Sequence, residues 1–302
     1  MLNAAQNIDA MQIILVNPPP ASDWNCQPQN RDHAEYMYPY ILIFLLNYLL
    51  KKGIGAKLFD LYDTETSYLF EYCRGISSAI VGVTCLSDNR YCAEEIIRKI
   101  KKLIPGSIIV VGGKHFGYCA HDTLLHIKEV DIVVRGEGEI TFYELVTALR
   151  EKKKLNNIKG ITFRENGQVI MNPEREPEPN IEEFALDYSL IPENNFLRGV
   201  LLRNYEKERI YSIPVVLTRG CDQKCVFCCY NKFKFRVRNL ENVMKELRFL
   251  KEKHKILYFT FSDPSFCERR AFVKEFCNEL IKGDFNIKWY CEARSDTPIE
   301  LL

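Results

Sequence analysis

The sequence predicts an α/β protein in which a doubly wound, Rossmann-like parallel sheet precedes an incomplete β/α barrel. Short apolar runs rich in β-branched residues alternate with amphipathic stretches up to about residue 150, and a second alternation of this kind begins near residue 209. With 302 residues, the chain is long enough for about two domains. The predicted segments are a tail at 1–10, the sheet domain at 11–154, a hairpin and linker at 155–208, and the partial barrel at 209–302.

The first domain contains five apolar runs with the length and composition of buried parallel strands. Helices between them imply right-handed crossovers. Ligands of such sheets bind beyond the carboxyl ends of the strands, so the loops that follow the runs form the expected binding edge. The expected strands are 11–16, 56–60, 79–84, 107–111 and 131–134, and the expected helices are 39–52, 65–74, 93–103 and 140–150.

The next stretch changes character. Residues 160–164 and 169–171 flank Asn166-Gly167, which predicts a β-hairpin with a tight turn. Residues 173–187 hold three prolines and six acidic residues against one arginine, which predicts an extended linker. We expect its acidic side chains to face water.

The second domain repeats the strand and helix alternation about three times. Leu240, Val243, Met244, Leu247 and Leu250 form the apolar stripe of an amphipathic helix. Residues at the carboxyl ends of barrel strands build the site in this architecture. The expected strands are 215–218, 255–261 and 286–291, with a helix at 268–281 and the start of another at 298–302.

Composition excludes several classes of function. The formal net charge is +1, so the whole chain gives no reason to expect a nucleic-acid partner. Residues 219–255 carry eleven Lys or Arg against four acidic residues, yet the helical stripe within them favours a solvated helix face over an RNA site. The longest apolar run, 41–46, is too short to cross a membrane. Twelve cysteines without a signal peptide predict a cytoplasmic protein.

The sequence that carries the most chemistry lies at residues 218–230. Cys221, Cys225 and Cys228 stand at C-x3-C-x2-C spacing. Iron–sulfur clusters are held by Cys thiolates, commonly four for a [4Fe–4S] cluster, so three leave one iron open to another ligand. The alternative is a zinc site with Cys229 or His254 as the fourth ligand, but the paired Cys-x2-Cys halves typical of zinc are missing.

These residues, with Phe227 before the last Cys, resemble the signature of the radical S-adenosylmethionine (SAM) superfamily. The resemblance implies that Cys221, Cys225 and Cys228 hold the cluster, and that SAM binds the open iron and is cleaved to methionine and a 5′-deoxyadenosyl radical. It also implies a small-molecule substrate and an electron donor such as flavodoxin or ferredoxin. Phe227 is the expected aromatic contact of SAM within the loop.

Two strand ends of the second domain also resemble this family. Phe-Ser-Asp-Pro-Ser-Phe around Asp263 and Trp-Tyr-Cys-Glu-Ala-Arg-Ser-Asp around Glu292 and Arg294 are similar to strand ends of its cobalamin-type members. Carboxylates can accept hydrogen bonds from ribose hydroxyls or the ammonium, and Arg can bind the methionyl carboxylate. The alternative for each is a salt bridge within the barrel wall. The other cysteines nearby, Cys229, Cys267, Cys277 and Cys291, are expected to be core residues or bystanders.

The loops of the first domain resemble those of the cobalamin (B12)-binding domain that precedes many radical SAM cores. The residues that carry this likeness are Thr84, Leu86, Ser87, Gly112 and Gly113, with Arg-Gly-Glu-Gly-Glu at 135–139. Glycines let the backbone approach a flat macrocycle closely. The Asp-x-His-x-x-Gly stretch that supplies a cobalt ligand in other cobalamin domains is missing, and His33 lies outside such a pattern. The alternatives are cobalamin without a protein ligand from below, or an empty sheet.

The leading functional hypothesis is therefore a radical SAM enzyme, or its N-terminal fragment, that uses cobalamin to methylate or rearrange an unknown substrate. Only about three of the family's six strand and helix units are present, so we expect a fragment or a truncated product. A methylthiotransferase is an alternative, although Cys26, Cys73, Cys85, Cys92 and Cys119 form no compact ligand motif. A non-catalytic module that binds a cluster or a corrinoid is another.

Overall fold

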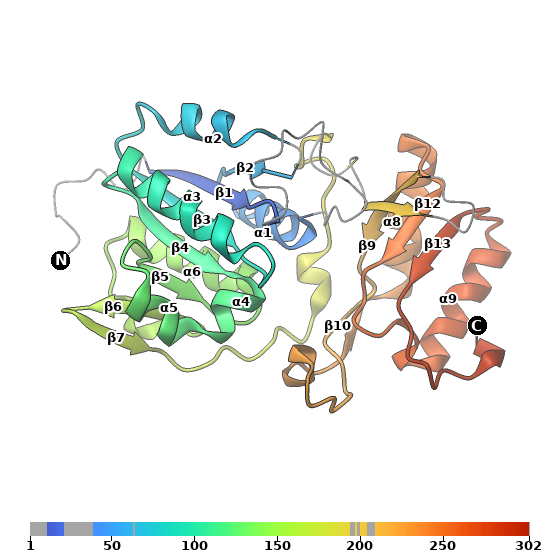
Figure 1. Ribbon diagram of the computed structural model, residues 1–302. Coiled ribbons are helices and arrows are strands. Elements are labelled where there is room, and N and C mark those ends of the chain that lie inside the picture. Colours follow the sequence, from blue (N-terminus) through green and yellow to red (C-terminus); the bar gives the residue numbers. More distant parts are fainter. Residues whose placement is uncertain are drawn as a thin grey trace. The chain divides into compact units, whose positions relative to one another are not determined.

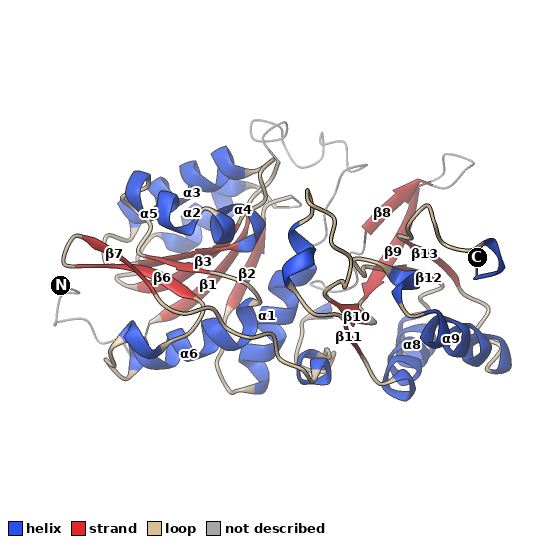
Figure 2. Cartoon of the chain, turned by 90° about the horizontal axis from the view of Figure 1, so that it is seen from below, coloured by secondary structure: helices blue, strands red, loops and turns tan. Residues whose placement is uncertain are grey.

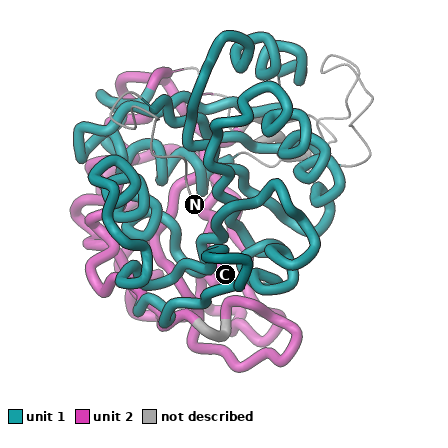
Figure 3. Tube along the Cα trace, turned by 90° about the vertical axis from the view of Figure 1, so that its left-hand side faces the viewer, with its two compact units in different colours: residues 1–32, 39–176, 186–191 teal, residues 33–38, 177–185, 192–302 magenta. Residues whose placement is uncertain are grey.

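The protein is described by a computed structural model and divides into two compact units (Figure 3). The first unit includes residues 39–176 and 186–191, and the second includes residues 177–185 and 192–302. The predicted tail at 1–10 and His33 lie outside the described residues. The structure describes residues 11–20, 39–62, 64–193, 197, 200–203 and 209–301.

The first unit is built on a seven-stranded sheet with the order β2-β1-β3-β4-β5-β6-β7 (Figure 1). Five neighbouring strands are parallel, which confirms the predicted doubly wound sheet. Strand order reverses between β1 and β3, the position at which such sheets bind ligands. The parallel strands are β1 (Gln12–Asn17), β2 (Lys57–Asp60), β3 (Ala79–Thr84), β4 (Ile108–Gly112) and β5 (Ile132–Val134).

Helices cover both faces of this sheet (Figure 2). Side chains of β1 alternate between the two cores: Ile14 and Val16 face one, and Ile13 and Leu15 face the other. The two short helices α4 and α5 were not predicted, because neither is long enough to show a helical period. One face carries α1 (Tyr40–Lys51) and α6 (Gly138–Arg150), and the other carries α2 (Thr66–Cys73), α3 (Arg90–Leu103), α4 (Gly113–Tyr118) and α5 (Ala120–His126).

The predicted hairpin joins this sheet. In its turn, Asn166 and Gly167 have φ values of 50° and 80°, the left-handed pair that a two-residue turn needs. Strand β6 (Ile161–Glu165) pairs antiparallel with β5 and with β7 (Gln168–Met171). The hairpin therefore belongs to the first unit, whereas the sequence placed it in a separate segment from residue 155.

The acidic linker is not solvated throughout, contrary to the sequence-based expectation. Arg238, which is 7% exposed, binds Glu182 Oε1 at 3.3 Å and Glu246 Oε2 at 2.6 Å. Arg236 donates to the Glu178 carbonyl at 2.8 Å. Arg236 and Arg238 of the basic stretch therefore do not face water, and they bind residues 177–185 to the second unit.

The second unit contains a four-stranded sheet with the order β13-β12-β9-β8. Strands β9, β12 and β13 are parallel, while β8 pairs antiparallel with β9. Together with two helices, the parallel strands form the expected partial barrel. Its elements are β8 (Val200–Arg203), β9 (Arg209–Val215), β12 (Tyr258–Phe261), β13 (Lys288–Cys291), α8 (Leu240–His254) and α9 (Arg270–Lys282).

The first barrel strand was predicted too late in the chain. The expected strand at 215–218 lies mostly beyond β9, whose pairing with β12 ends at Val215. Thr218–Arg219 instead form β10, which pairs antiparallel with β11 (Arg236–Val237) in a separate two-stranded sheet. The apolar run continues past the strand because Val216 and Leu217 are also buried, so composition alone does not reveal where the strand ends.

Short 3-10 turns complete the described structure, and the predicted helix start at 298–302 is one of them. Within the described part of the chain, no helix is both long and apolar enough to span a bilayer. The turns are η5 (Leu155–Asn157), η6 (Ile181–Phe184), η7 (Cys229–Lys232), η8 (Phe266–Glu268) and η9 (Ile299–Leu301).

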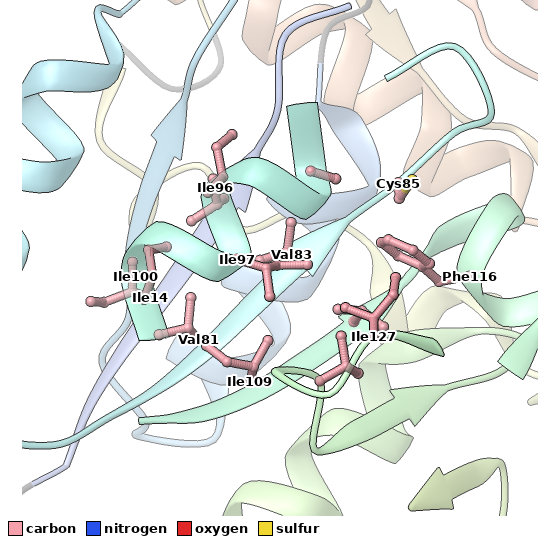
Figure 4. Close-up of a cluster of buried hydrophobic side chains, with 14 of the residues drawn as sticks. Ile14, Val81, Val83, Cys85, Ile96, Ile97, Ile100, Ile109, Phe116 and Ile127 are labelled. Carbon is pink, nitrogen blue, oxygen red and sulfur yellow. The ribbon is translucent and has the colours of Figure 1, made fainter. Parts of the chain in front are cut away.

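One core of the first unit lies under α3 and α4 (Figure 4). Ile97 of α3 is fully buried there with Val81 and Val83 of β3, and Phe116 of α4 belongs to the same cluster. Exposed positions of α3 such as Glu95 make no part of this core.

We expect Ile97→Ala to lower the free energy of unfolding by about 2 to 4 kcal/mol, because it removes buried methyl groups and leaves a cavity. Urea denaturation followed by circular dichroism measures the change. Glu95→Ala, on the exposed side of the same helix, is the matched control. Equal stability of the two variants would contradict the assignment of this core.

Candidate functional site

The loop that carries the predicted cluster ligands, residues 220–235, is closed at its base. Strands β10 and β11 pair Thr218 with Val237. Above them, Cys221 N donates to the Phe233 carbonyl at 3.0 Å, and Phe235 N donates to Asp222 Oδ1 at 3.1 Å. We call residues 220–235 the Cys loop. Its first and last residues are held together, so the cysteines are presented on a compact loop.

Gly220 is the residue that permits this closure. Its φ of +77° is left-handed, and a Cβ at this position would lie 2.1 Å from the Lys234 carbonyl oxygen and 2.5 Å from that of Phe233. No side chain fits between these two parts of the backbone. A glycine is thus required directly before Cys221, because the backbone at the other end of the loop occupies the space of a side chain.

The three predicted ligands are all partly exposed. Cys228 N donates to the Cys225 carbonyl at 3.0 Å, which forms a turn between them. At the tip of that turn, Val226 is 97% and Phe227 is 90% exposed. Burial raises the pKa of the Cys221 thiol, and the negative charge of Glu268 raises it further. Both effects disfavour the thiolate form of Cys221 in the absence of a metal.

Asp263 is buried and binds the backbone that leads into the Cys loop, which the sequence did not indicate. It is 3% exposed, and its Oδ1 accepts hydrogen bonds from Leu217 N at 3.0 Å, Thr218 Oγ1 at 2.7 Å and Thr218 N. These bonds fix the strand that leads into the Cys loop. Oδ1 of Asp263 thus binds the protein backbone, and the contact of Asp263 with a cofactor stays a prediction.

Arg294 does reach the Cys loop. Its Nη1 lies 3.7 Å from Cys225 Sγ, and its fork binds both oxygens of Asp296 at 2.9 and 2.8 Å. This hydrogen bond and ion pair raise the pKa of the Arg294 guanidinium and lower the pKa of Asp296. The predicted convergence of the β13 end with the cysteines is present, although Asp296 takes the place of the expected ligand carboxylate.

Two further carboxylates lie at these strand ends. Glu292 is exposed, and its carbonyl accepts a hydrogen bond from Phe266 N at 3.1 Å, which ties the end of β13 to that of β12. Glu268, not singled out from the sequence, accepts from Gln223 Nε2 at 2.9 Å. Its position five residues beyond Asp263, past the strand end, is the signal that could have found it.

The donor set of the Cys loop consists of three cysteine thiols. Among the described residues, no three His, Cys, Asp or Glu side chains converge to hold one metal ion. A zinc site needs its ligands around one atom, whereas each thiolate of a [4Fe–4S] cluster binds a different iron. Three partly exposed thiols on one closed loop are consistent with the second arrangement.

The predicted binding edge of the first unit is also assembled. The loops after β3 and β4 lie against each other, because Cys85 N donates to the Gly112 carbonyl at 3.0 Å and His115 N donates to the Cys85 carbonyl at 3.1 Å. The five predicted contacts are thereby brought to one end of two adjacent strands. They are Thr84, Leu86, Ser87, Gly112 and Gly113.

Gly113 was expected to let the backbone approach a macrocycle, but the structure gives another reason for a glycine at this position. Its φ is +86°, and a Cβ would meet the Cys85 carbonyl oxygen at 2.6 Å and Thr84 Oγ1 at 2.8 Å. The neighbouring loop of the protein, and not an incoming ligand, occupies the space that a side chain would need. A Cβ added at Gly112 would make only ordinary van der Waals contacts, the nearest with the Val134 carbonyl oxygen at 3.5 Å.

Two polar residues at this edge, Asn89 and His115, were not singled out from the sequence. Ser87 Oγ and His115 Nδ1 are 3.1 Å apart. Asn89, which follows β3, accepts a hydrogen bond from Leu86 N and donates one to the Pro18 carbonyl in the loop after β1. Asn17 Nδ2 donates to Asp60 Oδ1 at 2.9 Å. His115 follows Gly112-Gly113 by two residues, which is the signal that could have found it.

Arg135, which the sequence placed at the same edge, is buried at 6% exposure and holds the hairpin. It donates to the Ile161 carbonyl at 3.2 Å, to the Asn172 carbonyl and to the Glu174 carboxylate. Its role in the described structure is therefore to fasten β6 and the following segment to the end of β5.

Comparison with known proteins bears on both sites. Residues 35–146 match the family model of the B12 binding domain. Over 294 residues the chain is 29% identical to an uncharacterized methyltransferase of Pyrococcus horikoshii, which covers 95% of this chain and 61% of the relative. Over 298 residues it is 27% identical to the anaerobic magnesium-protoporphyrin IX monomethyl ester cyclase of Rubrivivax gelatinosus, covering 94% of this chain and 50% of the relative.

The fold matches the radical S-adenosylmethionine methyltransferase TsrM of Kitasatospora setae, solved with cobalamin and a [4Fe–4S] cluster bound. The TM-score is 0.71 at 19% identity, covering 96% of this chain and 55% of that one. The chain is similar to the B12-binding branch of the radical SAM superfamily, and residues 35–146 match its B12 binding domain. OxsB, a cobalamin-dependent SAM radical enzyme, matches this chain with a TM-score of 0.70 at 20% identity, over 97% of this chain and 41% of OxsB.

The chain spans about half to three fifths of the length of the two curated relatives. Its sheet unit and its three-strand partial barrel are therefore the parts that can be compared directly. Neither the substrate of any relative nor its full set of site residues follows for this chain from that likeness.

We expect Gly220→Ala to open the Cys loop and to abolish most iron binding after anaerobic reconstitution, because its Cβ would overlap the backbone of Phe233 and Lys234. Iron and sulfide analysis measures the loss. Gly167→Ala is the matched control, since Gly167 also has a φ of +80° but no atom within 4 Å of a built Cβ. The control isolates backbone strain, expected at about 1 kcal/mol. Equal iron binding by the two variants would contradict the role of Gly220.

Proposed function

We propose that this chain binds a [4Fe–4S] cluster, SAM and cobalamin, and that it serves methyl transfer to a small molecule that its sequence does not identify. The observation that carries the proposal is the closed Cys loop. It presents Cys221, Cys225 and Cys228 partly exposed, with Arg294 3.7 Å from one sulfur. The likeness to B12-binding radical SAM proteins, among them several methyltransferases, supports the reaction class.

The predicted site residues of the second unit have the following proposed roles. The three cysteines hold three irons and leave the fourth for SAM. Arg294 releases Asp296 and binds the methionyl carboxylate of SAM with the two nitrogens of its guanidinium group. The exposed carboxylate of Glu292 accepts hydrogen bonds from the cofactor, and the 90% exposed ring of Phe227 provides an apolar contact. When bound, the cluster supplies the electron that cleaves SAM to a 5′-deoxyadenosyl radical.

In the first unit, the joined loops after β3 and β4 are the proposed corrinoid contact. Thr84, Leu86 and Ser87 lie at one strand end and Gly112-Gly113 at the next. Asn89 holds the loop after β3 by its bonds to Leu86 and to the Pro18 carbonyl, and Gly113 lets the loop after β4 approach Cys85. When bound, cobalamin supplies the methyl-transfer chemistry. No residue is assigned here as a ligand of the cobalt.

The electron for SAM cleavage is proposed to come from a small redox protein such as flavodoxin or ferredoxin. A cyclase among the relatives makes ring formation the second candidate reaction. Product analysis separates the two, because methyl transfer adds the label of [methyl-²H₃]SAM to the product and cyclisation does not.

We expect the anaerobically reconstituted chain to show the Mössbauer signature of a [4Fe–4S] cluster. Replacing Cys221, Cys225 or Cys228 by Ala removes one thiolate ligand and should eliminate that signal. Cys229→Ala is the matched control, as Cys229 is partly exposed next to Cys228 but stands outside the predicted ligand spacing. A wild-type chain without a four-iron signal, or one whose cluster survives loss of Cys225, would overturn the cluster proposal.

We expect hydroxocobalamin to bind the chain with a saturable change in its visible spectrum. Gly113→Ala should weaken binding at least about tenfold, a loss of about 1.4 kcal/mol, because the new Cβ pushes the two loops apart. The control is Gly75→Ala, where φ is +84° and no atom lies within 4 Å of a built Cβ. Absence of any spectral change in the wild type would favour a sheet unit without a cofactor.

A further inference from the structure

The carboxylate of Glu268 lies against the Cys loop from the turn η8 that follows β12. Its Oε1 accepts a hydrogen bond from Gln223 Nε2 at 2.9 Å, and its Oε2 lies 4.0 Å from Cys221 Sγ. Gln223 stands two residues after Cys221 in the same loop. One carboxylate is therefore held beside a proposed cluster ligand by a neighbour of that ligand.

No cation neutralises this carboxylate in the described structure. Glu268 has no ion-pair partner among the described residues. The adjacent Arg269 guanidinium lies over the Phe235 ring, 5.4 Å from its centroid. Glu268 is also half-buried, and a half-buried charge is screened less by salt than an exposed one. Its negative charge therefore acts on the cysteine beside it.

The charges near the second ligand behave differently. Arg294 lies 3.7 Å from Cys225 Sγ, but both oxygens of Asp296 bind its guanidinium. The positive charge at Cys225 is thus paired with a negative one, and the two largely cancel at a distance. Glu268, by contrast, is a carboxylate without an ion-pair partner among the described residues, and it lies 4.0 Å from a proposed ligand.

We propose that Glu268, oriented by Gln223, lowers the reduction potential of the cluster held by the Cys loop, an inference that rests on the proposed function. Reduction adds one negative charge to the cluster, and a fixed carboxylate next to Cys221 opposes it. Cluster potentials depend on net charge, hydrogen bonds to sulfur and solvent exposure. A lower potential makes the reduced cluster a stronger donor of the electron that SAM cleavage needs.

The test is a redox titration of the reconstituted chain without SAM, followed by electron paramagnetic resonance of the reduced cluster. Glu268→Gln removes the charge but keeps a side chain of the same length. It should raise the midpoint potential by at least about 30 mV, a threefold change in the equilibrium of a one-electron couple. Glu268→Asp keeps the charge and should stay closer to the wild type. Glu275→Gln removes an exposed carboxylate on α9 and should change nothing.

Gln223→Leu provides an independent measurement, because it leaves the charge but removes the bond that orients it. A smaller upward shift is expected. A wild-type chain that forms no cluster overturns the proposed function itself. A complete cluster with the wild-type potential in Glu268→Gln overturns only this inference, as does an equal shift in Glu268→Asp. If Glu268→Gln does not retain its cluster, an unchanged potential in Gln223→Leu overturns the inference and an upward shift supports it.

Discussion

The buried carboxylate of Asp263 fixes the geometry on which the candidate cluster site depends. It accepts hydrogen bonds from Leu217 N and from both donors of Thr218, at the point where the chain leaves β9 for the Cys loop. Burial raises the pKa of Asp263 to about 6, which shows that placing the carboxylate there is costly, and the hydrogen bonds offset part of this cost. Two residues later, Gly220 lets the loop close on itself.

Both units use the same means to bring chemistry-bearing residues to strand ends. In each, one glycine with positive φ faces backbone from a different part of the chain: Gly220 meets residues 233–234 at the far end of the same loop, and Gly113 meets Cys85 in the neighbouring loop. A glycine in such a place is required by the protein's own backbone, so its presence does not by itself point to a ligand. The loops that these glycines join, with their partly exposed thiols and hydroxyls, are the surfaces on which cofactor binding is proposed.

The alternation of apolar runs and helical stripes was sufficient to predict the parallel sheet, the hairpin and most of the partial barrel, because strands buried on both faces are continuous apolar runs that differ clearly from amphipathic helices. It could not locate α4, α5 or the end of β9, since short helices and buried loop residues such as Leu217 share the composition of strands. For the site, the cysteine spacing is local in sequence and could be recognised. The roles of Asp263 and Glu268 could not, because they depend on contacts across more than 40 residues.

Arg294 illustrates why a correct position does not fix a role. The sequence places it at the end of β13, and the structure brings it to Cys225, but its fork is taken up by Asp296 two residues away. Both partners are exposed, and exposed ion pairs contribute little to stability because solvent competes for the same groups. Exchange of Asp296 for another carboxylate therefore has a small cost, and the pair keeps the guanidinium oriented toward the loop until that exchange occurs.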